Sequence, residues 1–124
     1  MAINEKDFVP IRYPLVVIES PLRGSVRRNV AYAKAAMLDS IGRGEAPYAS
    51  HLLYAQAGIL DDTNADERKA GMARGLAWSA KGDLVAAYVD LGVSDGMRAG
   101  IEAAGKAGTA IEYRTVPGWK WPPA

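Results

Sequence analysis

The sequence predicts an α/β fold built on a small parallel sheet, a flavodoxin-like or Rossmann-like sandwich with right-handed crossovers. Large aliphatic residues run together at 15–18, and a second fully apolar run stands at 84–89. Such runs are typical of strands that are covered on both faces, as in a parallel sheet. Segments with helical spacing separate the apolar runs. Because parallel strands need a crossover connection, this alternation predicts strand–helix–strand units.

The first half of the chain contains two of the expected strands, with a helix between them. The strand at 15–18 runs into the loop Ser20-Pro21-Leu22-Arg23-Gly24. A helix follows at once, with Ser25 as its N-cap and Gly42 or Gly44 near its end. Residues 46–53 are expected to form a second short strand that runs into a loop. The helix is expected to turn one apolar stripe toward the core, made of Val26, Val30, Ala33, Met37 and Ile41.

The second half repeats the pattern. Asn64, with Glu67 three residues later, resembles a capping box and predicts a helix over about 65–80. A strand at 84–89 follows, and Ser94 opens a further helix that ends at Gly108. Within that helix, Met97, Ile101 and Ala104 are expected to face the core. Residues 109–116 alternate and predict a last strand, with Ile111 and Tyr113 on one face.

Length and composition limit the class of protein. We expect one domain over residues 1–124, with its core at about 14–116 and a proline-flanked tail at 117–124. The chain has 15 Lys and Arg against 14 Asp and Glu, a net charge of +1, which argues against bulk electrostatic capture of nucleic acid. It has no cysteine and one histidine, so we expect no disulfide and no metal or other cofactor.

The sequence also predicts a cytoplasmic protein with no membrane partner. Residues 1–9 are polar, with Glu5, Lys6 and Asp7, and therefore do not resemble a signal peptide. No apolar stretch reaches the length needed to span a bilayer. The absence of cysteine fits a reducing compartment.

Three loops are expected to share the carboxyl edge of the sheet, at 20–25, 51–56 and 90–96. In open α/β sheets, ligands bind at this edge, where backbone N–H groups and a helix N-terminus converge on an anion. The guanidinium of Arg23 suits a phosphate or carboxylate, although an ordinary turn with a solvated arginine explains the same residues. Together the three loops predict a nucleotide site. The candidate ligand-binding residues are Ser20, Pro21, Arg23, Gly24, Ser25, His51, Tyr54, Asp90, Ser94, Gly96, Met97 and Gly100.

Several of these candidates have a purely structural alternative. His51 is either a ligand contact or a hydrogen-bonded histidine of the core. Ser94 is first of all a helix N-cap, and Asp95 suits the first turn of a helix in any case. Tyr54 has packing as its alternative role. The convergence of all of them on one edge is a stronger signal than any single residue.

Two blocks of the sequence carry a resemblance to a known family. The first is Ser20-Pro21-Leu22-Arg23-Gly24; the second is the strand at 83–90 followed by Gly92-Val93-Ser94-Asp95-Gly96-Met97. In order and spacing these blocks, with segments 49–53 and 60–62, resemble the nucleoside 2-deoxyribosyltransferase-like superfamily. That superfamily includes the 2′-deoxynucleoside 5′-phosphate N-hydrolases, and the match looks closest to its small phage and prophage branch. The resemblance covers 14–116.

The resemblance implies a site and an assembly. The loop at 20–24 would receive a 5′-phosphate, and a nucleophilic Glu would stand six residues after Ser94. Relatives of this kind are homo-oligomers, which implies that the tail with Trp119 and Trp121 lies at an interface. The alternative is that this tail folds back over its own core.

The chain departs from the implied pattern at the nucleophile, because Gly100 stands where the Glu is expected. Cleavage of a glycosidic bond by this route needs a carboxylate, which glycine cannot supply. Asp90 or Asp95 is the candidate substitute. Glu102 is a further candidate, although two residues along a helix are a rotation of about 200°.

Two function classes follow from this departure. The first is a non-catalytic nucleotide-binding protein, for example a phage-type anti-defence sponge for a host signal such as an ADP-ribose derivative. The second is an N-glycoside hydrolase or deoxyribosyltransferase that acts on (deoxy)nucleoside 5′-phosphates through Asp90, Asp95 or Glu102. A weaker third class is an interaction module that uses Trp119 and Trp121.

Overall fold

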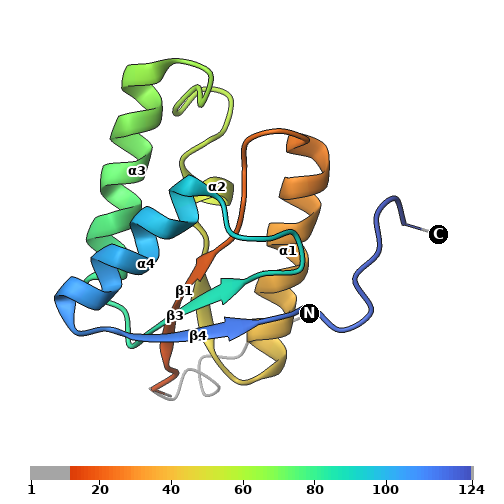
Figure 1. Cartoon of the computed structure of the whole chain (residues 1–124), viewed down its shortest axis with the longest axis vertical. Coiled ribbons are helices and arrows are strands. Elements are labelled where there is room, and N and C mark those ends of the chain that lie inside the picture. The colour runs from red at the N-terminus through yellow and green to blue at the C-terminus, as the bar shows by residue number, and fades with distance from the viewer. Residues whose placement is uncertain (1–11, 124) are drawn as a thin grey trace, which may run out of the picture.

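The computed structural model of the protein describes residues 12–123 and contains a four-stranded, all-parallel sheet (Figure 1). Its strands are β1 (Leu15–Glu19), β2 (Ala46–Tyr48), β3 (Leu84–Tyr88) and β4 (Ala110–Arg114), in the spatial order β2-β1-β3-β4. Helix α1 (Val26–Gly42) covers one face of the sheet. The α/β fold with a parallel sheet, predicted from the sequence, is confirmed.

The other face is covered by α4 (Asp95–Ala107), which packs beside α3 (Ala65–Ser79). Both helices begin at the predicted caps. The Asn64 side chain accepts hydrogen bonds from the backbone N–H groups of Asp66 and Glu67, at 3.0 and 3.1 Å. Ser94 Oγ accepts from Met97 N at 3.2 Å, and Gly108, with a φ of 76°, ends α4. Local cap chemistry therefore sets where these two helices begin.

The segment at 46–53 differs from the predicted strand. The strand ends at Tyr48, and the short helix α2 (Ser50–Leu53) follows. Ala49 is buried, and Leu52 packs against the core cluster on the α1 side of the sheet. The chain leaves the sheet early because burying these side chains requires a turn toward α1.

The buried face of α1 also differs from the predicted stripe. Val26 and Ile41, at the two ends of that stripe, are 54% and 55% exposed. The helix is rotated so that polar side chains enter the interior, and each of them finds a hydrogen-bond partner there. The side chains that α1 buries are Asn29, Tyr32, Ala33, Ala36 and Ser40.

A buried ion pair ties the last strand to the start of β2. Both terminal nitrogens of Arg114 donate to the carboxylate of Glu45, each at 2.7 Å. This contact holds the pKa of Glu45 below its usual range. Tyr88 OH lies beside the guanidinium and donates to Asp39 at 2.7 Å. The network links β4, β3 and α1 without using any residue of the predicted site.

The first half of the tail folds back over the core. Val116 N donates to Asp90 Oδ2 at 2.8 Å, and the Trp119 ring packs edge-on against Tyr32 with centroids 4.9 Å apart. Trp121 remains 39% exposed. Trp119 thus follows the alternative stated for the tail, and homo-oligomer formation stays a prediction.

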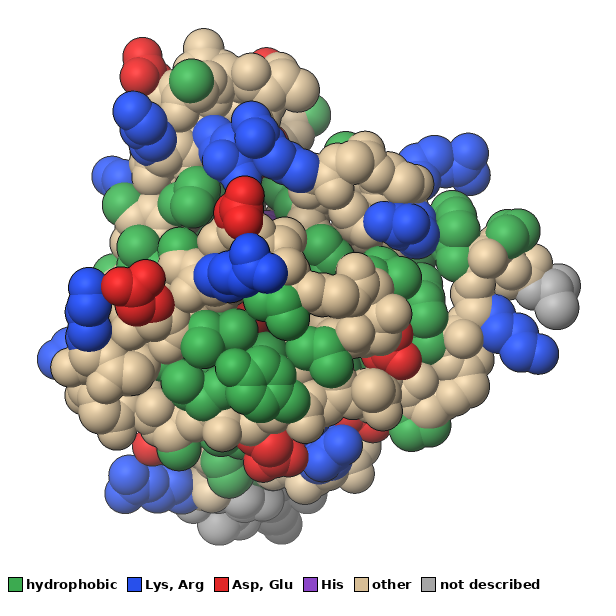
Figure 2. Space-filling model, viewed as in Figure 1, with side chains coloured by type: hydrophobic (Ala, Val, Ile, Leu, Met, Phe, Trp, Pro, Cys, Tyr) green, Lys and Arg blue, Asp and Glu red, His purple; other side chains and the backbone are tan. Residues whose placement is uncertain are grey.

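The outer surface holds one further feature. Figure 2 shows apolar side chains gathered over β4 and α4, and Tyr113 of β4 is 61% exposed. Between residues 12 and 123, no helix is both long and apolar enough to cross a membrane.

Candidate functional site

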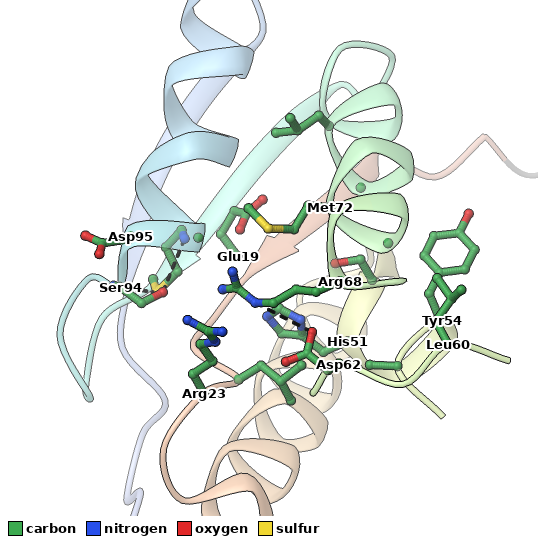
Figure 3. A pocket seen from close by; sticks show the side chains of 18 of the residues that line it. Glu19, Arg23, His51, Tyr54, Leu60, Asp62, Arg68, Met72, Ser94 and Asp95 are labelled. Atoms are coloured by element: carbon green, nitrogen blue, oxygen red, sulfur yellow. Dashed lines mark hydrogen bonds and ion pairs between the residues drawn. The ribbon is translucent and has the colours of Figure 1, made fainter. Parts of the chain in front are cut away.

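A cavity of about 480 Å³ opens at the carboxyl ends of β1 and β3 (Figure 3). The strand order reverses at this point, because β1 continues to β2 on one side and pairs with β3 on the other. Open α/β sheets bind ligands at such reversals. The pocket is walled by the loop after β1, by α2, by α3 and by the start of α4.

Two arginines stand at one side of the pocket. Figure 3 shows the guanidinium groups of Arg23, from the loop after β1, and Arg68, from α3, pointing into the same space. Arg68 Nε lies 3.8 Å from Asp62 Oδ1. Within residues 12–123, no carboxylate pairs with Arg23. Two guanidinium groups with this little compensation favour a phosphate or carboxylate ligand.

The amino terminus of α4 forms another wall. Val93, Ser94, Gly96 and Met97 line the pocket there. The first N–H groups of a helix have no partner inside the helix, and the macrodipole adds partial positive charge. Asp95 lines the same wall, but its side chain is fully exposed and lies 3.3 Å from Arg98. The wall therefore adds to the attraction that the two arginines exert on an anion.

Glu19, the last residue of β1, carries a carboxyl group at the floor of the pocket. No hydrogen-bond or ion-pair partner for this group lies within residues 12–123. Burial raises the pKa of Glu19 to about 8, so the carboxyl is mostly protonated at neutral pH. Active sites often hold a titratable group with a shifted pKa in a cleft, which makes Glu19 a candidate residue of this site.

The loop that carries Arg23 is held from two sides. The buried amide of Asn29 donates to the carbonyl oxygens of Leu22 and Arg23, at 2.9 and 2.8 Å. His51 lines the pocket, and its Nε2 bonds to the carbonyl oxygen of Ser20. Burial lowers the pKa of His51, so the ring is neutral and donates the Nε2 proton to that carbonyl. His51 is thus a hydrogen-bonded histidine that also lines the pocket, and its contact with a ligand stays a prediction.

The wall formed by α3 beyond Arg68 is mostly apolar. Gly71, Met72, Gly75 and Leu76 of α3 contribute to it, together with Leu60. Tyr54 lines the pocket with its hydroxyl turned to Trp78, whose Nε1 donates to it at 3.1 Å. Flat, apolar surface of this kind suits an uncharged ring system.

Comparison with known proteins adds a family and a fold relative. A family described as a domain of unknown function, DUF7768, matches residues 14–114. The chain belongs to this family. No curated protein matches it.

Among solved structures, the chain is similar to a 2-deoxyribosyltransferase from the psychrotolerant bacterium Bacillus psychrosaccharolyticus. The two share 12% sequence identity at a TM-score of 0.61, and the match covers 86% of this chain and 75% of that chain. At this identity the likeness establishes a shared fold. The predicted resemblance to the deoxyribosyltransferase-like superfamily is therefore confirmed at the level of a distant fold relationship.

Some residues singled out in the sequence line the pocket, and others lie elsewhere. Ser20 and Pro21 are buried at the start of the loop after β1 and do not line the cavity, whereas Gly24 and Ser25 are exposed outside it. Gly100 lies under the Glu19 carboxyl. The predicted residues that line the pocket are Arg23, His51, Tyr54, Ser94, Asp95, Gly96 and Met97.

Two of the three candidate carboxylates lie away from the cavity. Asp90 faces α1, where its Oδ2 accepts from Tyr32 OH at 2.5 Å. Glu102 is exposed on α4 and lies 3.1 Å from Lys106 Nζ. Neither lines the pocket. Glu102 lies on the exposed side of α4, turned away from the pocket. Asp90 is held toward α1 by its hydrogen bond with Tyr32.

Sequence reasoning missed three residues of the site. Glu19 and Arg68 line the pocket, and Asn29 holds its loop. A Glu that directly follows a run of buried aliphatics was the one available signal for Glu19. Arg68 and Asn29 lie in helices whose neighbours are identified only by the tertiary fold.

Proposed function

We propose that the pocket binds a nucleoside 5′-phosphate. The observation that carries this proposal is the division of one cavity into a cationic side, with Arg23 and Arg68, and an apolar side formed by the turns of α3 beyond Arg68. A nucleotide has the same division, because its phosphate is anionic and its base is a flat ring. A volume of about 480 Å³ is sufficient for such a ligand.

In the arrangement we propose, the phosphate lies between the two arginines and the start of α4. The base rests against Met72 and Leu76, and the sugar lies over Glu19. The fold shared with a 2-deoxyribosyltransferase supports a ligand of the nucleoside class. The phosphate of the proposed ligand is inferred from the two arginines and the start of α4, and not from the fold relative.

The prediction of binding without turnover depends on Gly100, which stands where the nucleophilic Glu is expected. The Glu19 carboxyl fills the space beside Gly100, so the pocket does contain a carboxyl group. This observation favours N-glycosidic cleavage as the second candidate function. A sponge for an ADP-ribose derivative is the narrower form of the first, and it requires that the bound ligand stays intact.

Titration calorimetry tests the proposal. The probes are the four common 2′-deoxynucleoside 5′-monophosphates, the matching nucleosides, inorganic phosphate and ADP-ribose. We expect saturable binding of at least one monophosphate, with weaker binding of its nucleoside and of phosphate alone. Absence of binding for every probe would overturn the proposal, and preferred binding of ADP-ribose without any chemical change would favour the sponge.

A further inference from the structure

Glu19 and Gly100 share one volume at the floor of the pocket. Gly100 is buried on the side of α4 that packs on the sheet. A Cβ atom added there would lie 2.0 Å from Glu19 Oε1, 2.5 Å from its Cδ and 3.0 Å from Oε2. Contacts this short do not occur between real atoms, so no other residue type fits at position 100 while Glu19 keeps its place.

The carboxyl that fills this volume has no structural partner within residues 12–123. Burying a polar group without a hydrogen bond is unfavourable, and proteins normally provide a partner for it. The buried Arg114, for example, is paired with Glu45 at 2.7 Å. Among the described residues, Ser20 Oγ and Tyr48 OH are also buried without a partner, but they are hydroxyls and not groups that carry a charge. The missing partner of Glu19 is therefore to be sought in the ligand, because its carboxyl faces the cavity (Figure 3).

We propose that Glu19 is the catalytic carboxyl of this pocket and that Gly100 provides the room it needs. This inference rests on the proposed function, and it adds a chemical step on the bound nucleotide. Cleavage of a glycosidic bond passes through a cation-like state at the anomeric carbon, which a carboxylate stabilises or attacks. Glu19 is a half-buried carboxyl at the floor of the cavity, and the sugar position proposed above lies over it.

The step balances with water as the co-reactant. A Glu19 oxygen forms a bond to C1′, the C1′–N bond breaks, and its electron pair leaves with the base, which takes a proton from solvent. Water then forms a bond to C1′, the bond to Glu19 breaks, and the proton of the water returns to solvent. The products are the free base and the sugar 5′-phosphate, and the Glu19 carboxylate is regenerated.

The protonation state of Glu19 sets the pH dependence of this step. Attack needs the ionised form, and burial raises the pKa of Glu19 to about 8. Turnover should therefore rise about tenfold per pH unit below pH 8 and become constant above it. The charged and titratable groups around the carboxyl are Arg23, Tyr48, His51, Tyr54, Asp62, Glu67, Arg68 and Asp95. Of these, His51 has a pKa lowered from 6.5 and Tyr48 a pKa raised from 10, so neither titrates near 8.

The decisive variants are Glu19→Gln and a positional exchange. Glu19→Gln keeps the shape of the side chain and removes the nucleophile. The rate of base release at pH 8 from the 2′-deoxynucleoside 5′-monophosphate that binds best, measured by chromatography, should fall at least 100-fold. The calorimetric Kd should change less than about threefold. Glu102→Gln on the exposed side of α4 is the matched control and should leave both quantities unchanged.

The exchange tests whether the two positions are coupled. Gly100→Glu alone should lower the melting temperature, because its side chain meets the Glu19 carboxyl. In the Glu19→Gly background the same change should be tolerated and should restore base release at least tenfold over Glu19→Gly alone. Equal loss of stability in both backgrounds would remove the coupling, since coupled neighbours are non-additive.

The outcomes separate this inference from the proposed function. If the wild-type protein binds a monophosphate and releases no base from any of the four, the inference is overturned and the binding function stands. Full turnover by Glu19→Gln overturns it as well. If nothing binds, both fail together.

Discussion

The side-chain amide of Asn29 donates a hydrogen bond of 2.8 Å to the carbonyl oxygen of Arg23. Asn29 is buried in α1, whereas Arg23 is exposed at the edge of the pocket. A second bond from the same amide reaches the carbonyl of Leu22 at 2.9 Å. The backbone of the arginine that points into the cavity is therefore fixed from the interior of the protein.

Replacing Asn29 should affect both stability and binding. Asn29→Ala removes the donor from two carbonyl oxygens and should lower the free energy of unfolding by about 1–3 kcal/mol. It should also weaken monophosphate binding, because the Arg23 backbone is no longer fixed. Urea unfolding and calorimetry measure the two effects. Loss of stability with unchanged phosphate affinity would limit Asn29 to a structural role.

Replacing Arg23 should weaken the binding of phosphorylated ligands selectively. Arg23→Ala removes a charge-assisted hydrogen bond and should cost about 1.5–3 kcal/mol of monophosphate affinity, with little effect on the nucleoside. Arg27→Ala is the matched control, because Arg27 is exposed on α1 and does not line the pocket. Equal losses for nucleoside and monophosphate would remove the phosphate from this side of the pocket.

The stability of the folded protein should depend on pH through Glu19. The pKa of Glu19 is about 8 in the folded protein, against an ordinary value of 4.5. Below about pH 4.5 the carboxyl is protonated in both states, so its burial costs least there. As the pH rises from 4.5 to 8 the unfolded chain ionises first, which favours unfolding, and the cost is constant above about 8.

Glu19→Gln removes this dependence and isolates it from other groups. At pH 8 the variant should be more stable than the wild type by about 1–3 kcal/mol, and the difference should vanish near pH 4. His51 acts in the opposite direction at lower pH, because its lowered pKa stabilises the fold above 6.5 and that contribution is lost as the pH falls. A difference between the two proteins that does not change with pH would contradict the raised pKa.

The state of assembly is a separate prediction. We expect at least a dimer at micromolar concentration, measured by light scattering. Because Trp119 packs on Tyr32 of its own chain, Trp119→Ala should lower the free energy of unfolding and have little effect on the molar mass. Tyr113→Ser, on the exposed surface of β4, should do the reverse if this surface forms the interface. A monomeric wild-type protein would contradict the prediction.

Sequence reasoning found the elements whose signals are local. The aliphatic run before Glu19 and the cap at Ser94 identify β1 and α4, because burial on both faces and a missing N–H partner leave a mark in neighbouring residues. The buried side of α1 could not be predicted from the sequence in this way. Asn29 and Tyr32 are polar, and their burial depends on partners from Leu22 and Asp90.

The floor of the pocket was beyond sequence reasoning for a similar reason. From the sequence alone, Gly100 indicates the loss of a carboxylate, because no neighbouring residue in the sequence occupies its place. Only the packing of α4 on β1 brings the Glu19 carboxyl into that space. The position of Arg68 could not be predicted for the same reason, because its place beside Arg23 depends on how α3 packs at the end of the sheet.

The most direct test of the account is a crystal structure of the Glu19→Gln variant with the 2′-deoxynucleoside 5′-monophosphate that binds best. The account predicts the phosphate between Arg23, Arg68 and the first turn of α4, the base against α3, and C1′ in contact with the side chain at position 19. A ligand bound elsewhere, for example in the groove formed by Val26, Val30 and residues 55–63, would contradict it. An empty pocket at saturating ligand would contradict it equally.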